Sequence, residues 1–297
     1  MKHVYSLEDL SSPEFRQSMP NAKLAVIGWP IKHSASPQMH QAALDQAGID
    51  LQYIRAEVAP GEVARCFEIM QNLGFLGCNV TVPHKIKAMQ LCDERSDDAI
   101  CLGATNTIKF ESGKRYGHNT DGPGLARAIE EDFGKNLSEL KVLILGAGGG
   151  AGRAIATQCA RLGSPSLYLS NRTVSKVETL AENLTKGYGA TNTHAIDNSS
   201  EALMQAASNV NLIINSTSLG LKPEDPLPLP IEALDSKPMV YDAIYNPAVT
   251  PLLAAAQEKQ CATANGLSML LHQGALAFEY WLNTPADIPS MRSGLNL

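Results

Sequence analysis

The sequence predicts a two-domain α/β protein whose second domain is a Rossmann-type, doubly wound sheet. Three observations support this fold class. The chain has 297 residues, whereas a common domain has roughly 100–150. Short apolar runs alternate with segments of helical pattern, as in parallel sheets covered by helices. Near the middle, the apolar run Lys141–Leu145 leads into a glycine-rich turn and a helical run, which marks a new domain.

The first half alternates predicted strands and helices. Leu24–Ile27 reads as a buried strand, and residues 51–58, 77–81 and 105–109 read as further strands. Helical patterns cover about 38–47 and 61–73, a third helix is expected to begin at Pro83, and a fourth lies near Asp97. This alternation predicts a largely parallel sheet covered by helices.

The second half repeats the pattern around a longer apolar strand. Residues 141–145 form a near-continuous apolar run, and 167–169, 212–214 and 239–241 are shorter ones. The apolar helical stretch 267–281 follows the last of these runs, and we expect it to cross back to the first domain. The predicted domains are therefore 1–121, completed by 267–297, and 122–266.

Composition and charge narrow the function classes. Hydrophobic residues make up 44% of the chain and charged residues 18%, which is typical of a globular chain. The net charge is -6 and no basic block is present, so nucleic-acid binding is not expected. No apolar run reaches the roughly 20 residues of a membrane span, and the N-terminus lacks the pattern of a signal peptide, so a cytoplasmic location is expected. Neither the cysteines nor the histidines show metal-ligand spacing, and no metal is expected.

The glycine-rich turn predicts a dinucleotide site. Gly146, Gly148 and Ala151 form a G-x-G-x-x-A pattern directly after a predicted strand and before the helical run 153–161. In this pattern the first glycine permits a tight turn, the second lets the backbone approach a pyrophosphate, and Ala151 allows the helix to pack closely on the strand. The phosphates would then lie at the positive N-terminus of the helix. The alternative is a glycine-rich loop that binds nothing.

The end of the next strand favours NADP over NAD. NAD enzymes place an acidic residue there for the ribose 2′-hydroxyl, but this chain continues after Leu169 with Ser170-Asn171-Arg172-Thr173 and has Lys176 nearby. Arg172 and Lys176 supply charge for a 2′-phosphate, while Asn171 and Thr173 can hydrogen-bond it. The alternative is an ordinary turn at the end of a strand with a helix cap.

Polar side chains in the first half form a candidate substrate site. Ser34 and Ser36 are two apart, so in extended backbone their hydroxyls would face the same way and hold a carboxylate. Asn79 and Thr81 repeat this spacing, and Asn106 is polar in a strand-like stretch. The alternative is that these residues cap helices or satisfy turns.

Lys85 and Asp121 are the candidate pair for proton transfer. Lys85 is expected just inside the helix begun at Pro83, where the positive end of the helix dipole disfavours an ammonium, and such lysines can serve as acid or base. Asp121 lies in a turn-rich segment near the domain junction. The alternatives are a surface lysine and a turn or cap aspartate. Together the polar groups supply what the reduction of a carbonyl needs.

The chain resembles the shikimate dehydrogenase family over nearly its whole length. The matching motifs follow one another in order, at residues 28–37, 77–85, 103–107, 119–122, 146–150, 171–173, 215–220, 241–247 and 265–273. The resemblance implies NADPH-dependent reduction of 3-dehydroshikimate to shikimate, in the route to aromatic amino acids. It also implies a small-molecule substrate and allows a monomer or a homodimer.

The resemblance assigns roles to individual residues. Lys85 would be the acid/base residue, supported by Asp121. Ser34 and Ser36 would bind the substrate carboxylate. The residues that would hold the ring oxygens are Asn79, Thr81, Asn106, Tyr245 and Gln273. The residues that would bind NADP(H) are Gly146, Ala147, Gly148, Gly149, Gly150, Ala151, Asn171, Arg172, Thr173, Lys176, Ala243 and Gly266.

Three positions depart from the usual family pattern. Gln41 replaces Asn, Ser216 replaces Ala and Ser268 replaces Gly. None falls on a proposed catalytic residue, but they bear on substrate range, since relatives also accept quinate. Two other functions stay open: a quinate/shikimate dehydrogenase of broader specificity that uses NAD, and a sensor that binds shikimate-like acids without turnover.

Overall fold

The computed structural model describes residues 4–189 and 192–295. The chain forms two compact units, one from residues 1–120 and 273–297 and the other from residues 121–272. These bounds differ from the expected ones at both ends. Asp121 belongs to the second unit, and helix α12 (Leu267–Leu282) contributes residues to both units.

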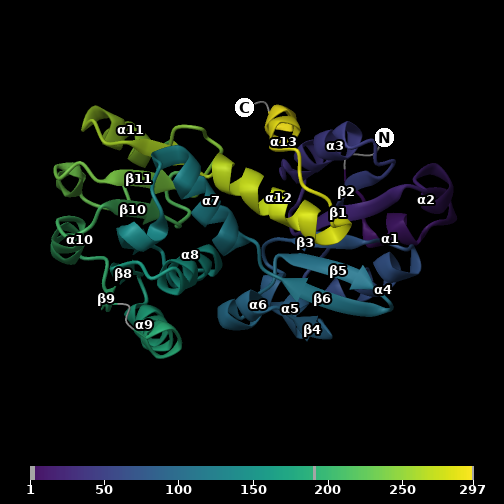
Figure 1. Cartoon of the computed structure of the whole chain (residues 1–297), viewed down its shortest axis with the longest axis horizontal. Coiled ribbons are helices and arrows are strands. Elements are labelled where there is room, and N and C mark those ends of the chain that lie inside the picture. The colour runs from purple at the N-terminus through teal and green to yellow at the C-terminus, as the bar shows by residue number, and fades with distance from the viewer. Residues whose placement is uncertain (1–3, 190–191, 296–297) are drawn as a thin grey trace. The chain divides into compact units, whose positions relative to one another are not determined.

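The first unit contains one mixed sheet with helices around it (Figure 1). Its elements are α1 (Leu7–Ser11), α2 (Pro13–Ser18), β1 (Ala22–Gly28), α3 (Ser36–Gln46), β2 (Gln52–Glu57), α4 (Val63–Asn72), β3 (Gly77–Val80), α5 (Lys85–Gln90), β4 (Glu94–Arg95), α6 (Asp97–Leu102), β5 (Thr107–Glu111), β6 (Lys114–His118), the second part of α12, and α13 (Ile288–Gly294). The strand order is β2-β1-β3-β5-β6-β4.

The expectation of a largely parallel sheet holds for five of the six strands, and β5 is the exception. Strand β1 runs parallel to β2 and β3, but β5 is antiparallel to both β3 and β6. The cause is the two-residue turn between β5 and β6. Ser112 and Gly113 both have positive φ angles, of 50° and 76°, as a tight hairpin turn requires. So short a connection reverses the chain and leaves no room for a crossover helix.

Each face of the first sheet has its own covering layer. On one face, Ile27, Val80 and other apolar strand residues pack against α1, α2, α4 and α5. On the other face, Tyr53 of β2 stacks on His40 of α3, and Trp281 of α12 donates from Nε1 to the carbonyl of Ile108 at 2.8 Å. The second face therefore combines apolar packing with polar side chains.

Helices α1 and α2 are absent from the sequence-based expectations. They span five and six residues, too few for a helical period to be read. Their first turns are instead defined by caps, because Ser6 accepts from the Asp9 amide and Ser12 accepts from the Phe15 amide.

The second unit is a wholly parallel sheet (Figure 1). Its elements are α7 (Asp121–Phe133), η1 (Leu137–Glu139), β7 (Lys141–Leu145), α8 (Gly150–Arg161), β8 (Ser166–Ser170), α9 (Val174–Tyr188), β9 (Asn192–Ile196), α10 (Ser200–Ala207), β10 (Leu212–Asn215), η2 (Ile231–Leu234), β11 (Met239–Asp242), α11 (Pro251–Glu258), β12 (Thr263–Asn265) and the first part of α12. The strand order is β12-β11-β10-β7-β8-β9. This is the Rossmann order, in which the direction of winding reverses between β7 and β10, and the prediction of a doubly wound sheet is confirmed.

Alternate residues of the central strand serve the two faces of this sheet. Val142 and Ile144 of β7 pack with α7, α8 and α9. Leu143 and Leu145 pack with α10, η2 and α11. A strand buried on both faces reads as a continuous apolar run, which is why β7 could be predicted. The edge strands β9 and β12 have no fully buried residue, and their sequences are too polar to be recognised as strands.

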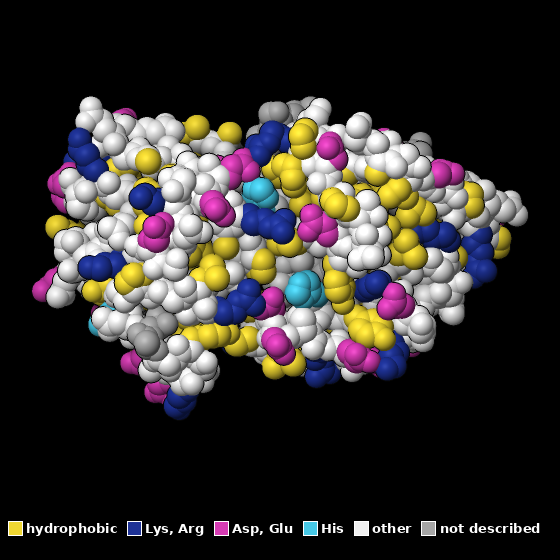
Figure 2. Space-filling view, viewed as in Figure 1, with side chains coloured by type: hydrophobic (Ala, Val, Ile, Leu, Met, Phe, Trp, Pro, Cys, Tyr) yellow, Lys and Arg dark blue, Asp and Glu magenta, His cyan; other side chains and the backbone are white. Residues whose placement is uncertain are grey.

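The exposed surface carries both signs of charge. On the face drawn in Figure 2, Lys and Arg side chains are interspersed with Asp and Glu, without a large patch of one sign. Within residues 4–189 and 192–295, no helix has both the length and the apolar character that crossing a membrane requires.

Candidate active site

The two serines meet, but not in the backbone that the sequence suggested. Ser36 is the first residue of α3, so the pair does not lie in extended backbone. The Ser34 hydroxyl nevertheless lies 3.3 Å from that of Ser36 and also accepts from the Ser36 amide. The Ser34 carbonyl accepts from Nε and Nη2 of Arg55 at 2.9 and 2.6 Å. Two hydroxyls this close together, on a backbone that Arg55 holds, form an arrangement suited to a carboxylate.

Asn79 lies at the centre of a buried polar network. Its Oδ1 accepts from the Tyr53 hydroxyl at 2.7 Å, and its Nδ2 donates to the Asn106 carbonyl and to Oγ1 of Thr107, each at 3.2 Å. Burial raises the pKa of Tyr53 well above its ordinary value, and a hydrogen bond with Ser36 offsets part of this rise. Tyr53 thereby connects the serine pair to Asn79. The sequence reasoning missed Tyr53, although it lies in a predicted strand.

Lys85 begins α5 instead of lying inside a helix that starts at Pro83. Helix α5 has six residues, and its N-cap, His84, makes no side-chain capping bond. Pro83 precedes the helix because residues 82 and 83 form a turn after β3. Lys85 is half-buried, and its carbonyl accepts from the Thr105 amide at 3.1 Å. Thr81, four residues earlier, donates its amide to the Ile27 carbonyl at 2.9 Å.

Asn106 fixes the backbone at Thr120, where the first segment of the first unit ends. It precedes β5 and is only 2% exposed. Its Oδ1 accepts from the Thr120 amide at 2.8 Å, and its Nδ2 lies 3.5 Å from Oε1 of Gln273. Asp121 follows Thr120 directly in the chain, begins α7 and is 8% exposed. The first unit therefore fixes the backbone that leads into this carboxylate.

The glycine turn has the geometry of a phosphate-binding loop. Gly146 follows β7 with a φ of +80°, a conformation that L side chains rarely adopt. The turn continues through Ala147 and Gly148 to Gly149, which precedes the first residue of α8 and accepts from the Arg153 amide. A side chain on Gly150 would meet nothing within 4 Å. The start of this 12-residue helix is therefore open to an anion.

The close packing that the sequence assigned to Ala151 occurs at Gly152. A Cβ atom on Gly152 would lie 2.4 Å from the Gly146 carbonyl and 2.6 Å from Oγ of Ser216. Gly152 is buried, whereas Ala151 is half-buried. Because helix α8 begins at Gly150, residue 152 faces the glycine turn instead of residue 151.

The end of β8 carries no acidic side chain. Asn171 packs on the glycine turn, since a Cβ atom on Gly148 would lie 2.7 Å from Cγ of Asn171, and its Nδ2 donates to the Thr173 carbonyl. Thr173 is the N-cap of α9, but its side chain makes no capping hydrogen bond. Arg172 and Lys176 are exposed. The alternative that this segment is only a turn with a helix cap therefore does not explain the Thr173 hydroxyl.

Three predicted residues lie beyond the ends of β11 and β12. The Ala243 amide donates to the Asn215 carbonyl at 2.8 Å, and the Gly266 amide donates to the Ile244 carbonyl at 3.1 Å. A Cβ atom on Gly266 would lie 2.1 Å from the Ala243 carbonyl oxygen, so only glycine permits this approach. Tyr245 is half-buried in the same loop.

His40 is a buried neighbour of the polar network. It is fully buried, it stacks on Tyr53 with ring centroids 4.4 Å apart, and within the described residues its ring nitrogens make no hydrogen bond of ordinary geometry. Burial lowers its pKa to about 3, and the Asn79 side chain offsets only part of that shift. The imidazole is therefore neutral.

The three departures from the family pattern each make hydrogen bonds within their own unit. Gln41 accepts from the Tyr53 amide at 3.1 Å and donates to the Leu51 carbonyl at 3.0 Å. Ser216 donates to the Leu145 carbonyl at 2.6 Å. Ser268 donates to Oδ2 of Asp132 at 2.6 Å.

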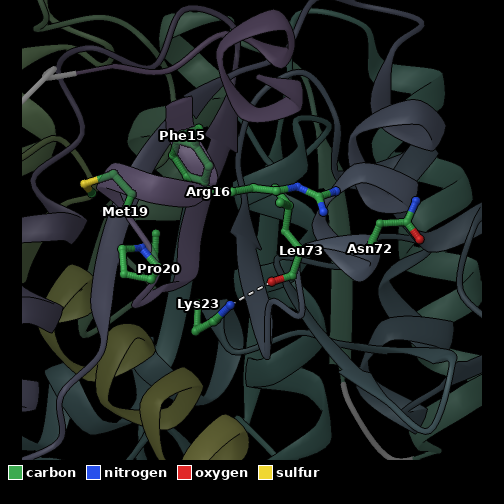
Figure 3. A pocket seen from close by; sticks show the side chains of 8 residues that line it. Phe15, Arg16, Met19, Pro20, Lys23, Asn72 and Leu73 are labelled. Carbon is green, nitrogen blue, oxygen red and sulfur yellow. Dashed lines mark hydrogen bonds between the residues drawn. The ribbon is translucent and has the colours of Figure 1, made fainter. Parts of the chain in front are cut away.

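A pocket of about 260 Å³ lies elsewhere in the first unit, at α2, the start of β1 and the end of α4 (Figure 3). Lys23, which lines it, donates to the Leu73 carbonyl at 2.7 Å. None of the sequence-predicted site residues lines this pocket. In the described parts of the chain, no group of three or more His, Cys, Asp or Glu is placed to hold a metal ion.

Comparison with known proteins agrees with this geometry. Three family models match: the shikimate dehydrogenase substrate binding domain at residues 26–108, shikimate/quinate 5-dehydrogenase at 127–222, and the shikimate 5′-dehydrogenase C-terminal domain at 266–293. The shikimate dehydrogenase (NADP(+)) of Methanocaldococcus jannaschii is 39% identical over 287 residues, which cover 93% of this chain and 98% of the relative.

Solved structures extend the likeness to three dimensions. A crystal structure of a shikimate dehydrogenase in complex with NADP+ matches with a TM-score of 0.83 and 36% identity, covering 93% of this chain and 95% of the other. Quinate dehydrogenase from Corynebacterium glutamicum in complex with NAD matches with a TM-score of 0.83 and 27% identity, covering 93% and 99%. The chain is thus a member of the shikimate/quinate dehydrogenase family.

Proposed function

We propose that this protein is an NADP-dependent oxidoreductase that reversibly reduces 3-dehydroshikimate to shikimate, within the biosynthesis of aromatic amino acids. Lys85 serves as the acid/base residue, and Asp121 is its partner.

The arrangement at the carboxyl ends of β7 and β8 carries this proposal. A tight glycine turn leads into a 12-residue helix whose start is open, and pyrophosphates bind at such helix ends. The next strand ends in Asn171, Arg172 and Thr173. A guanidinium and hydroxyl there favour the 2′-phosphate of NADP, and the absence of a carboxylate disfavours the free ribose of NAD.

Apart from Tyr245, which belongs to the second unit, the residues of the substrate side come from the first unit. The hydroxyls of Ser34 and Ser36, 3.3 Å apart, would bind the substrate carboxylate. Asn79, Thr81, Asn106, Tyr245 and Gln273 would hold the ring oxygens. Donors that are already fixed by hydrogen bonds lose little freedom when a ligand binds, which favours selective recognition of a hydroxylated acid.

The chemistry needs one hydride and one proton. NADPH, which the glycine turn and Arg172 would hold, would supply the hydride for the carbonyl carbon of the substrate. Lys85, as an ammonium, gives its proton to the carbonyl oxygen, which becomes the new hydroxyl, and is left as a neutral amine. The carboxylate of Asp121 would orient Lys85. In the reverse direction Lys85 accepts the hydroxyl proton.

Two alternatives predict different measurements. A quinate/shikimate dehydrogenase would oxidise both acids, and the NAD complex of the quinate dehydrogenase relative is the specific observation in its favour. A sensor would bind the acid without turnover, but a binding protein does not need a proton donor. The presence of both Lys85 and Asp121 therefore favours an enzyme.

One absorbance assay tests these possibilities together. The purified protein is given shikimate or quinate, each with NADP+ or NAD+ at equal concentration, and reduction of the cofactor is followed. We expect reduction of NADP+ with shikimate to have the highest kcat/KM. Preference for NAD+ or quinate would favour the first alternative, and binding of shikimate without reduction would favour the sensor.

A further inference from the structure

Two motifs of the second unit contain buried polar residues, Asn215 and Asp242, that have no role in the proposed chemistry, and the structure joins them. Residues 215–220 cover the last residue of β10 and the loop beyond it, and residues 241–247 cover the end of β11 and the loop beyond it. Asn215 and Asp242, the last residues of these parallel strands, are register partners and fully buried. Nδ2 of Asn215 donates to Oδ1 of Asp242 at 3.0 Å.

Asp242 is a buried carboxylate held by neutral donors. Its Oδ1 also accepts from the Ile244 amide at 3.1 Å, and its Oδ2 accepts from the Thr250 hydroxyl at 2.7 Å. Burial raises its pKa, and these hydrogen bonds oppose the rise. In the described part of the chain no Lys or Arg pairs with it. Burying a carboxylate without a charged partner costs free energy. The position of Asp242, bonded to both ends of the 243–250 loop, therefore needs an explanation.

The Asn215 side chain uses all of its hydrogen-bonding capacity, mostly on the 216–220 loop that follows it. Besides the bond to Asp242, Nδ2 donates to the Leu219 carbonyl at 3.1 Å. Oδ1 accepts from both the amide and the hydroxyl of Thr217, at 3.1 and 2.7 Å. The pair therefore fixes the starts of two loops at once, 216–220 and 243–250.

Both loops lie next to residues of the proposed cofactor site. A Cβ atom on Gly146 would lie 2.8 Å from Cγ2 of Thr217, so the 216–220 loop packs directly on the glycine turn. The 243–250 loop begins at Ala243, against which Gly266 packs. Strands β10 and β7 are neighbours in the sheet, and the winding reverses between them. Ligands of doubly wound sheets bind at this switch point.

We infer that Asp242 and Asn215 act as a pair of positioning residues for the dinucleotide, fixing the two loops beside the glycine turn without contacting the cofactor. This inference rests on the proposed function. The network bonds Thr217 and Leu219 of one loop and Ile244 and Thr250 of the other, so both loops are held in place before the cofactor arrives. Preorganisation of this kind lowers the cost of binding.

Thr250 provides the sharpest test, because its hydroxyl links Asp242 to the far end of the 243–250 loop. Thr250→Val keeps the shape of the side chain and removes the hydroxyl, whereas Thr250→Ser keeps the hydroxyl and is the matched control. We expect Thr250→Val to weaken NADP+ binding, measured by titration calorimetry, about tenfold. The KM for shikimate should rise less than the Kd for NADP+, because Tyr245 is the one proposed substrate residue in this loop, and Thr250→Ser should resemble the wild type.

Asp242→Asn and Asn215→Ala extend the test to the pair itself. If both act through one network, the double variant should weaken NADP+ binding by much less than the product of the single effects. Thermal unfolding of each variant separates folding from positioning. Should Asp242→Asn fail to fold, the comparison of Thr250→Val with Thr250→Ser decides.

The outcomes distinguish this inference from the proposed function. Variants that unfold at lower temperature but bind NADP+ as tightly as the wild type would show that the network is merely structural, and would overturn the inference. Equal loss of affinity for NADP+ and shikimate would overturn it too. A wild-type protein that neither binds NADP+ nor oxidises shikimate would instead contradict the proposed function.

Discussion

Tyr53 donates its hydroxyl to Oδ1 of Asn79 at 2.7 Å, although the two residues lie on different strands, β2 and β3, with β1 between them. Both side chains are 5% exposed. The bond therefore ties the outer strand of this side of the sheet to the strand that leads into Lys85. Through this hydrogen bond, Tyr53, which packs on His40 of α3, contacts a residue of the candidate site.

Removing this hydroxyl should destabilise the fold. Tyr53→Phe leaves the buried Asn79 oxygen without its donor, which costs about 1–3 kcal/mol. Urea unfolding would measure the loss. Tyr168→Phe is the matched control, since no hydrogen bond of the Tyr168 hydroxyl occurs within the described residues, and we expect a change below about 0.5 kcal/mol. Equal effects of both substitutions would contradict this role of the Tyr53 hydroxyl.

Lys85→Ala should remove most of the turnover. Loss of a general acid/base costs about 100- to 10,000-fold in rate, while binding of shikimate, measured by calorimetry, should change little. Lys87→Ala is the control because Lys87 is exposed on the same short helix. Unchanged turnover in Lys85→Ala would exclude Lys85 from proton transfer.

Arg172→Gln should change cofactor preference. Without its guanidinium, the end of β8 loses a charged partner for the 2′-phosphate, so kcat/KM with NADPH should fall about tenfold or more. The value with NADH serves as the internal control and should stay nearly constant. A parallel fall with both cofactors would mean that Arg172 does not read the 2′-phosphate.

His40 should make the fold sensitive to acid. Its pKa is lowered from 6.5 to about 3 by burial, so below pH 6.5 the unfolded chain binds a proton that the folded chain does not. The free energy of unfolding should then fall by about 1.4 kcal/mol per pH unit from this group between about pH 6 and pH 4.

Two variants isolate the contribution of His40. His40→Leu removes the titrating group, so its unfolding free energy should depend less steeply on pH over the same range. His33→Gln alters an exposed histidine and should keep the wild-type slope. If His40→Leu retains the full acid dependence, other groups are responsible for it.

The fold class, the central strands and the cofactor turn could be predicted because short stretches of sequence encode them. The strand β7 is apolar on both faces, and the glycines that follow it permit a turn that few other residues allow. The absence of a carboxylate directly after β8 could likewise be read from a few consecutive residues. These features depend on residues within one strand and its turn.

Long-range geometry decided the rest. The hairpin between β5 and β6 made the first sheet mixed, and the start of α8 moved the close packing from Ala151 to Gly152. Asn215 and Asp242 lie 27 residues apart and meet only because β10 and β11 are neighbours in register. A local pattern shows which residues can donate, accept or turn. Only the packed chain determines which of them meet, since the free energy of each buried polar group depends on partners that are distant in sequence.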